Sequence, residues 1–139
     1  MATVLIVEDN QSVAKFYALA LERRGQFNSV HGHTADEVLE HARTGRVDLI
    51  LLDVSLASFT YQNRPIDGLE LSRLLKSDPQ TRHIPILLAT AHAMVGDRER
   101  FLETSSADDY LQKPIYDPDI LVEKVKGLLP KAAGDAALG

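Results

Sequence analysis

Short apolar runs of strand length alternate with helical patterns along the chain, and this alternation restricts the fold more than any other feature. The runs consist of consecutive aliphatic residues, as expected of strands that are buried on both faces. Parallel strands need long crossovers, and helical crossovers place a helical layer on each face of the sheet. The pattern predicts a doubly wound α/β domain with a five-stranded parallel sheet. We expect strands over residues 3–7, 27–31, 48–53, 85–89 and 108–111.

Helix-start signals lie between these strands. Thr34 and Glu37 have the spacing of a capping box, and Asp117-Pro118 has the order of a cap followed by a first-turn proline. Residues 54–66, in contrast, contain Ser, Thr, Gln, Asn and Pro without a period and predict a loop. The expected helices contain residues 13–20, 35–42, 71–75, 95–104 and 121–129.

Composition excludes several protein classes. The 139 residues suit one domain, which we expect over residues 1–130, with residues 131–139 as a flexible tail. The absence of cysteine excludes a disulfide scaffold, a Cys-ligated metal site and a thiol nucleophile. A net charge of −5 without a Lys/Arg block argues against direct nucleic-acid binding. Without a secretory signal or an apolar run of about 20 residues, we expect a cytoplasmic location and no membrane insertion.

Charged and polar residues follow the predicted strands at their carboxyl ends, where doubly wound sheets bind ligands. Glu8 and Asp9 follow the first strand, Asp53 ends the third, and Thr90 and Lys113 follow the last two. Three clustered carboxylates repel one another unless a cation offsets their charge. Carboxylate oxygens, waters and a phosphate are the ligands that Mg²⁺ prefers. The set predicts a magnesium site at which Asp53 accepts a phosphoryl group, with Thr90 and Lys113 contacting the phosphoryl oxygens.

These segments resemble the motifs of response-regulator receiver domains, the phospho-acceptor modules of two-component signalling. The resemblance runs through residues 3–129, and agreement of several short motifs in order and spacing is far more specific than any one of them. It implies a flavodoxin-like sheet with strand order 2-1-3-4-5. The matching segments are VLIVEDN (4–10), DLILLD (48–53), DGLE (67–70), IPILLATA (84–91) and DYLQKP (109–114).

The resemblance also implies roles for individual residues. Asp53 would be phosphorylated by a histidine kinase or a histidine phosphotransfer protein, in a stand-alone receiver that switches partner binding. Such a domain catalyses only its own phosphorylation and dephosphorylation and turns over no separate substrate. The implied Mg²⁺ ligands are Glu8, Asp9, Asp53 and the backbone carbonyl of Ser55.

Further along the chain, the resemblance implies that Thr90 and Tyr110 form a switch pair and that the Lys113–Pro114 peptide bond is cis. Two departures from the family pattern stand near the acceptor. Ala57 replaces a common proline, and an extra segment of about seven residues lies within residues 55–66. This segment borders the acceptor, so we expect it to screen Asp53 or to contact a specific partner.

Other interpretations remain open from the sequence. An Asp-nucleophile phosphohydrolase of the haloacid-dehalogenase kind needs a second Asp two residues after the nucleophile, where this chain has Ser55. A non-phosphorylated pseudo-receiver binding module is the other alternative. Glu8 and Asp9 could instead cap the first helix, Tyr110 could be core packing, and His92 could face either the pocket or solvent.

Overall fold

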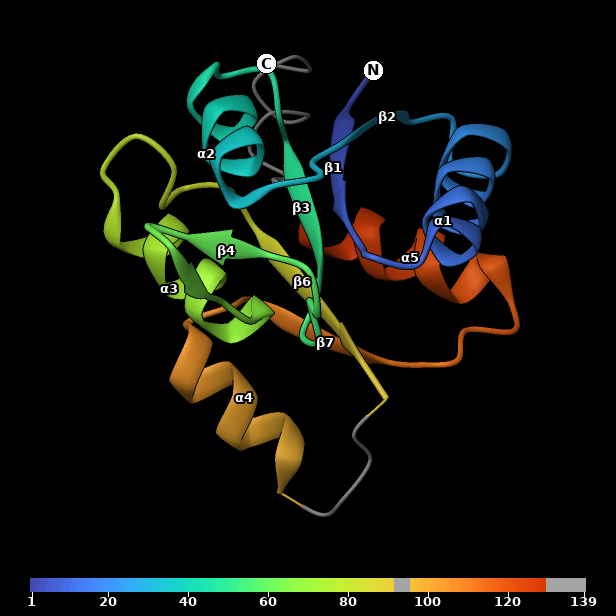
Figure 1. The fold of residues 1–139 in the computed structure, drawn as a ribbon. Helices are drawn as coiled ribbons and strands as arrows, with labels where there is room; N and C mark the ends of the chain where they lie inside the picture. Colours follow the sequence, from blue (N-terminus) through green and yellow to red (C-terminus); the bar gives the residue numbers. More distant parts are fainter. Residues whose placement is uncertain (92–95, 130–139) are drawn as a thin grey trace.

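A five-stranded parallel sheet forms the centre of the molecule in this computed structural model, which describes residues 1–91 and 96–129 (Figure 1). The strand order β2-β1-β3-β6-β7 confirms the predicted 2-1-3-4-5 arrangement, because β4 and β5 form a separate two-stranded ribbon. The observed strand bounds agree with the predicted runs to within one or two residues. The sheet strands are β1 (Thr3–Val7), β2 (Asn28–His31), β3 (Leu49–Asp53), β6 (Ile86–Thr90) and β7 (Asp109–Gln112).

Helices cover both faces of this sheet, as predicted. On one face, α1 and α5 pack against the sheet through one apolar cluster. On the other face, α2, α3 and α4 pack against it through a second cluster (Figure 1). The central strands β3 and β6 are buried along their whole length, which explains their uninterrupted aliphatic sequence. The helices are α1 (Gln11–Arg23), α2 (Ala35–Arg43), α3 (Gly68–Ser77), α4 (Asp97–Ser105) and α5 (Pro118–Leu128).

Side-chain caps begin four of these helices. The Thr34 hydroxyl accepts the Glu37 N–H at 3.0 Å, and the Glu37 carboxylate accepts the His33 N–H at 2.8 Å, which confirms the capping box. Asn10 caps α1 by accepting the Val13 N–H at 3.1 Å. Neither acid before Asn10 is the cap of α1, so both remain available for a pocket. Asp67 and Asp117 cap α3 and α5.

The prediction of an irregular loop over residues 54–66 is wrong in part. β4 (Thr60–Tyr61) pairs antiparallel with β5 (Arg64–Pro65), and the two residues between them have positive φ, as a type I′ hairpin turn requires. The strands are too short to produce a recognisable period, and the turn lacks the usual glycine. Four residues of the segment are buried in the core beside α2 and α3, namely Val54, Leu56, Phe59 and Ile66.

Some expectations fall on residues that the structure does not describe. His92 and the predicted tail at 131–139 lie outside the described residues. The helix predicted over 95–104 is found at Asp97–Ser105. Within the described part of the chain, no helix is long and apolar enough to cross a bilayer.

Candidate functional site

Strand alternation determines which face of the sheet carries each acidic residue. Ile6, Leu51 and Leu111 belong to the core beneath α1 and α5. Because successive side chains of a strand point to opposite faces, the residues two positions further along project from that same face, at its carboxyl edge. These residues are Glu8, Asp53 and Lys113.

Lys113 joins the two buried carboxylates. Its Nζ lies 2.7 Å from Glu8 Oε1 and 3.5 Å from Asp53 Oδ2. The side chains of Glu8 and Asp53 are only 2% and 6% exposed. The second Glu8 oxygen accepts the Asn10 N–H at 3.3 Å. Since one ammonium faces two carboxylates, this cluster retains negative charge that a cation can offset.

The electrostatics of this cluster follow from its burial. Burial is the main cause that raises the pKa of Asp53 from 3.8 to about 7, and the hydrogen bond and negative charge of Glu8 add to the effect. The Lys113 ammonium and the Ser55 N–H act in the opposite direction. Burial lowers the pKa of Lys113, but its hydrogen bond to Glu8 and the charges of both carboxylates outweigh burial and raise it. The lysine is therefore held in its charged form beside the acids.

The backbone around Asp53 packs closely against the start of α3. The Ser55 N–H donates to Asp53 Oδ1 at 3.4 Å, and the Gly68 N–H donates to the Val54 carbonyl at 2.8 Å. A Cβ at position 68 would clash with the Asp53 carbonyl oxygen. Glycine alone permits this approach, which explains why an Asp-Gly pair begins the helix beside Asp53.

Asp9 is bound by the inserted segment rather than by Lys113. The Ser58 N–H donates to Asp9 Oδ2 at 3.1 Å, and Ser58 Oγ donates to Asp9 Oδ1 at 3.2 Å. This contact joins residues 49 positions apart and was not predicted. The sequence around Ser58 does not indicate this contact with Asp9, because the contact depends on how the insertion folds over the sheet edge.

Thr90 and Tyr110 lie on the opposite face of the sheet, beside α3 and α4. Tyr110 neighbours Leu88 across the β6–β7 pair, and both contact the core on that face. Thr90 is 1% exposed, and its carbonyl accepts the Lys113 N–H at 2.7 Å. The ring centroids of Tyr110 and Phe101 lie 6.3 Å apart, so Tyr110 contributes to the packing of the core. The predicted cis bond between Lys113 and Pro114 is present.

The donor set fits Mg²⁺. Glu8, Asp9, Asp53 and the Ser55 carbonyl offer hard oxygen atoms at one sheet edge, and the cluster with Lys113 has more negative than positive charge. Within residues 1–91 and 96–129, no three acids or histidines gather into a preformed metal centre. Mg²⁺ commonly keeps several waters and takes only one or two carboxylates directly.

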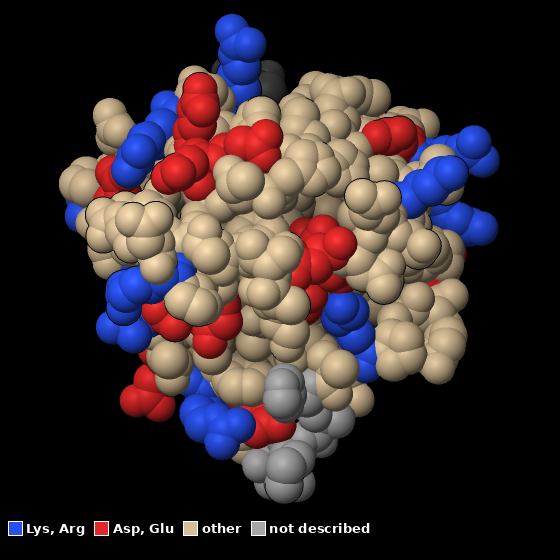
Figure 2. Space-filling view, in the orientation of Figure 1, with Lys and Arg blue, Asp and Glu red and all other residues tan. Residues whose placement is uncertain are grey.

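Charged side chains elsewhere are dispersed. Figure 2 shows acidic and basic groups interspersed over one face of the molecule, without a continuous basic stripe on that face.

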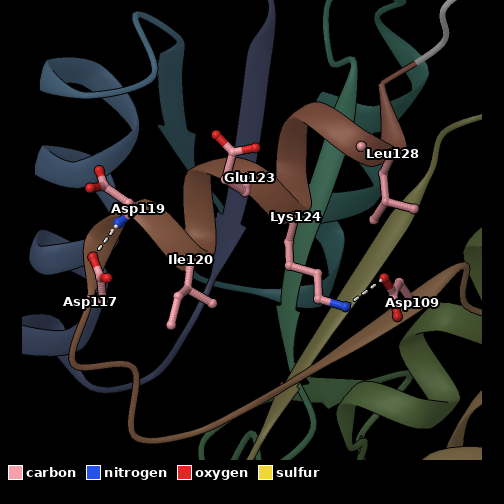
Figure 3. A pocket seen from close by; sticks show the side chains of 8 residues that line it. Asp109, Asp117, Asp119, Ile120, Glu123, Lys124 and Leu128 are labelled. Atoms are coloured by element: carbon pink, nitrogen blue, oxygen red, sulfur yellow. Dashed lines mark hydrogen bonds and ion pairs between the residues drawn. The ribbon is translucent and has the colours of Figure 1, made fainter.

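A separate hollow of about 460 Å³ lies along α5 and β7 (Figure 3), where Lys124 Nζ lies 3.1 Å from Asp109 Oδ2. Its other charged lining residues, Asp117, Asp119 and Glu123, are acidic, and no predicted site residue lines it.

Comparison with known proteins identifies the architecture. Residues 4–126 match the family described as the response regulator receiver domain. The chain belongs to this receiver family. It is 37% identical to the polar-differentiation response regulator DivK of Brucella anthropi over 134 residues, which cover 96% of this chain and 98% of DivK. DivK of Brucella ovis is 36% identical over the same length.

Solved receiver structures agree with the fold. A Chloroflexus aurantiacus protein described as a response regulator superposes with a TM-score of 0.77 at 31% identity, covering 91% of this chain and 96% of that one. The Vibrio cholerae chemotaxis protein CheY4 superposes with a TM-score of 0.78 at 24% identity, covering 93% and 99%. The chain is thus a receiver domain of two-component, phosphorylation-based signalling, and the phosphohydrolase alternative is not supported.

Proposed function

We propose that Asp53 is the phospho-acceptor of this receiver and that its donor is a phosphohistidine on a histidine kinase or phosphotransfer protein. The observation that carries the proposal is the buried Asp53 carboxylate facing the Lys113 ammonium at 3.5 Å. This contact combines an oxygen nucleophile with a cation for the charge that develops on the phosphoryl oxygens.

Transfer exchanges one bond to phosphorus for another. An Asp53 carboxylate oxygen attacks the phosphorus, and an O–P bond forms as the P–N bond to the donor imidazole breaks. The imidazole nitrogen leaves with the bonding electron pair. The product is an aspartyl phosphate, which water later hydrolyses to restore the carboxylate. The domain catalyses only these two steps on itself and acts on no separate substrate.

The neighbouring residues support the transfer in distinct ways. Lys113 pairs with one phosphoryl oxygen, and the Thr90 hydroxyl donates to another. Glu8, Asp9, Asp53 and the Ser55 carbonyl are the proposed Mg²⁺ ligands, and the ion supplies positive charge beside the phosphoryl group when it is bound. Thr90 and Tyr110 then form the switch pair, through which phosphorylation changes partner binding.

Acetyl phosphate with Mg²⁺ tests this proposal without a known kinase. Intact-mass spectrometry should show one added phosphoryl group on the wild-type chain and none on Asp53→Asn. Asp48→Asn is the matched control, because Asp48 lies immediately before β3 and bonds the Thr3 N–H at the opposite end of the strand. Label retained on Asp53→Asn, or none on the wild type, would contradict the proposal, and the latter result would favour a pseudo-receiver binding module.

A further inference from the structure

A buried tyrosine that lines the same hollow as Lys113 has an unpaired hydroxyl within the described part of the chain. Tyr17, on α1, is 2% exposed. Its hydroxyl has no hydrogen-bond partner among the residues that the structure describes. A buried donor without a partner is costly and uncommon in folded proteins, so the hydroxyl needs an explanation that ring packing alone does not give.

Tyr17 of α1 lies on the same side of the sheet as Glu8. The helix begins beside the carboxyl edge of the sheet, and long helical side chains lean back toward the helix N-terminus. Tyr17 packs in the core with Ile6, on the face of β1 from which Glu8 also projects. Burial, followed by the negative charges of Glu8 and then Asp53, raises the pKa of Tyr17.

The proposed phosphorylation removes a donor from Glu8. In the unphosphorylated protein, the Lys113 ammonium lies 2.7 Å from Glu8 Oε1. When that ammonium turns to a phosphoryl oxygen on Asp53, a 2%-exposed carboxylate loses its strongest partner. The proposed Mg²⁺ would occupy one Glu8 oxygen, and the other, which the lysine leaves, is unfavourable when buried without another donor. Tyr17, buried on the same face of the sheet, offers an O–H that no described residue uses.

We propose that Tyr17 is a positioning residue whose hydroxyl donates to the Glu8 carboxylate when Lys113 binds the phosphoryl group. The inference rests on the proposed function of Asp53. Tyr17 itself contacts neither the phosphorus nor the donor; it holds Glu8 in place while the lysine is engaged elsewhere. A tyrosine that serves only as core packing would be replaced by phenylalanine without effect on this step.

Tyr17→Phe separates the two roles, because it removes one oxygen atom and preserves the ring. Without ligands, we expect the variant to melt at the wild-type temperature or above, since it removes an unpaired buried hydroxyl. Its affinity for beryllofluoride with Mg²⁺, which copies the phosphoryl group, should fall roughly ten-fold, the effect of one hydrogen bond to a charged group. Tyr116→Phe is the matched control, because Tyr116 is 88% exposed.

Glu8→Gln tests whether Tyr17 acts through Glu8. In a double-mutant cycle, Tyr17→Phe should weaken beryllofluoride binding far less in the Glu8→Gln background than in the wild type. Equal affinities of wild type and Tyr17→Phe would overturn the inference, as would strictly additive losses in the cycle. If the wild type itself fails to bind beryllofluoride and Mg²⁺, the proposed function fails instead.

Discussion

At the scale of single residues, the pocket is defined by two buried carboxylates that share one ammonium. Asp53 and Glu8 both contact Lys113, and the burial that isolates them from water also raises the pKa of Asp53 to about 7. A charged Asp53 is therefore unfavourable in the folded protein without a cation. The same property makes the site responsive to Mg²⁺ and to a phosphoryl group.

The first prediction concerns pH in the presence of a chelator. Between pH 3.8 and about 7, folded Asp53 retains a proton that the unfolded chain has released. The free energy of unfolding should therefore fall as the pH rises through this window, by at most about 1.4 kcal/mol per pH unit from this group. Asp53→Asn should show a flatter profile and greater stability at pH 8 in urea unfolding. If Asp53→Asn keeps a slope as steep as that of the wild type, groups other than Asp53 cause the pH dependence.

The second prediction concerns Mg²⁺ and Asp9. A ligand that binds only the folded state stabilises it by RT ln(1 + [L]/Kd), so Mg²⁺ should raise the melting temperature of the wild type. Asp9→Asn should lose most of that increase, because it removes a carboxylate that the proposed site provides. Equal shifts in both proteins would place the ion elsewhere. Calcium in place of magnesium is a useful comparison, since it demands more oxygen ligands.

At the scale of elements, the β4–β5 hairpin lies within the segment that the sequence predicts to be an insertion. Its base is part of the fold, because Leu56, Phe59 and Ile66 are buried in the core. The tip, residues 60–65, is mostly exposed. Ser58 at the base also binds the Asp9 carboxylate, so the insertion contacts the acid pocket directly. Deleting the whole insertion would remove these core contacts, so it differs from a surface loop, whose length has little effect on stability.

The third prediction separates the tip from the base. The Ile66 N–H donates to the Phe59 carbonyl at 3.1 Å, so these two residues already have the spacing of a β-turn. Replacing residues 60–65 by Asn-Gly should leave the domain folded, whereas Phe59→Ala should cost about 3–5 kcal/mol. We expect the shortened protein to hydrolyse its aspartyl phosphate faster, because water reaches the pocket more easily. An unchanged lifetime and unchanged transfer from the kinase would make the tip a neutral insertion.

The fourth prediction concerns the capping box of α2. Thr34→Ala removes the acceptor of the Glu37 N–H and should lower the free energy of unfolding by about 1 kcal/mol. Phosphorylation should be unaffected, because α2 contributes no residue to the proposed site. Thr34→Ser, which keeps the hydroxyl, is the matched control. A loss as large with serine as with alanine would show that the methyl group, rather than the cap, is responsible.

At the scale of the whole molecule, the parts of the fold predicted from sequence are those that local chemistry determines. Uninterrupted aliphatic runs located the central strands, and the cap at Thr34 located a helix start. The carboxyl-edge rule then placed Asp53 beside Lys113 without knowledge of the contacts. Tyr17 lies within the helix predicted over 13–20, but a helical period does not indicate where a hydroxyl finds a partner.

The hairpin and the Ser58–Asp9 contact could not be predicted, for a physical reason. Two-residue strands are shorter than any detectable period, and Gln62-Asn63 is not among the usual signals for a turn with positive φ. Ser58 and Asp9 meet only because the insertion packs over the sheet edge, which is a tertiary event. Sequence therefore predicted the proximity of Asp53 and Lys113 but not the hairpin, nor the contact of Ser58 at its base with Asp9.

Borohydride trapping tests the central claim, phosphorylation of Asp53, most directly. Borohydride reduces an aspartyl phosphate to homoserine, so the modified position can be read from a proteolytic peptide by tandem mass spectrometry. After treatment with acetyl phosphate and Mg²⁺, we predict homoserine at position 53, and none when either reagent is omitted. Homoserine at Asp9, Asp48 or any other acid, with Asp53 unmodified, would contradict the account.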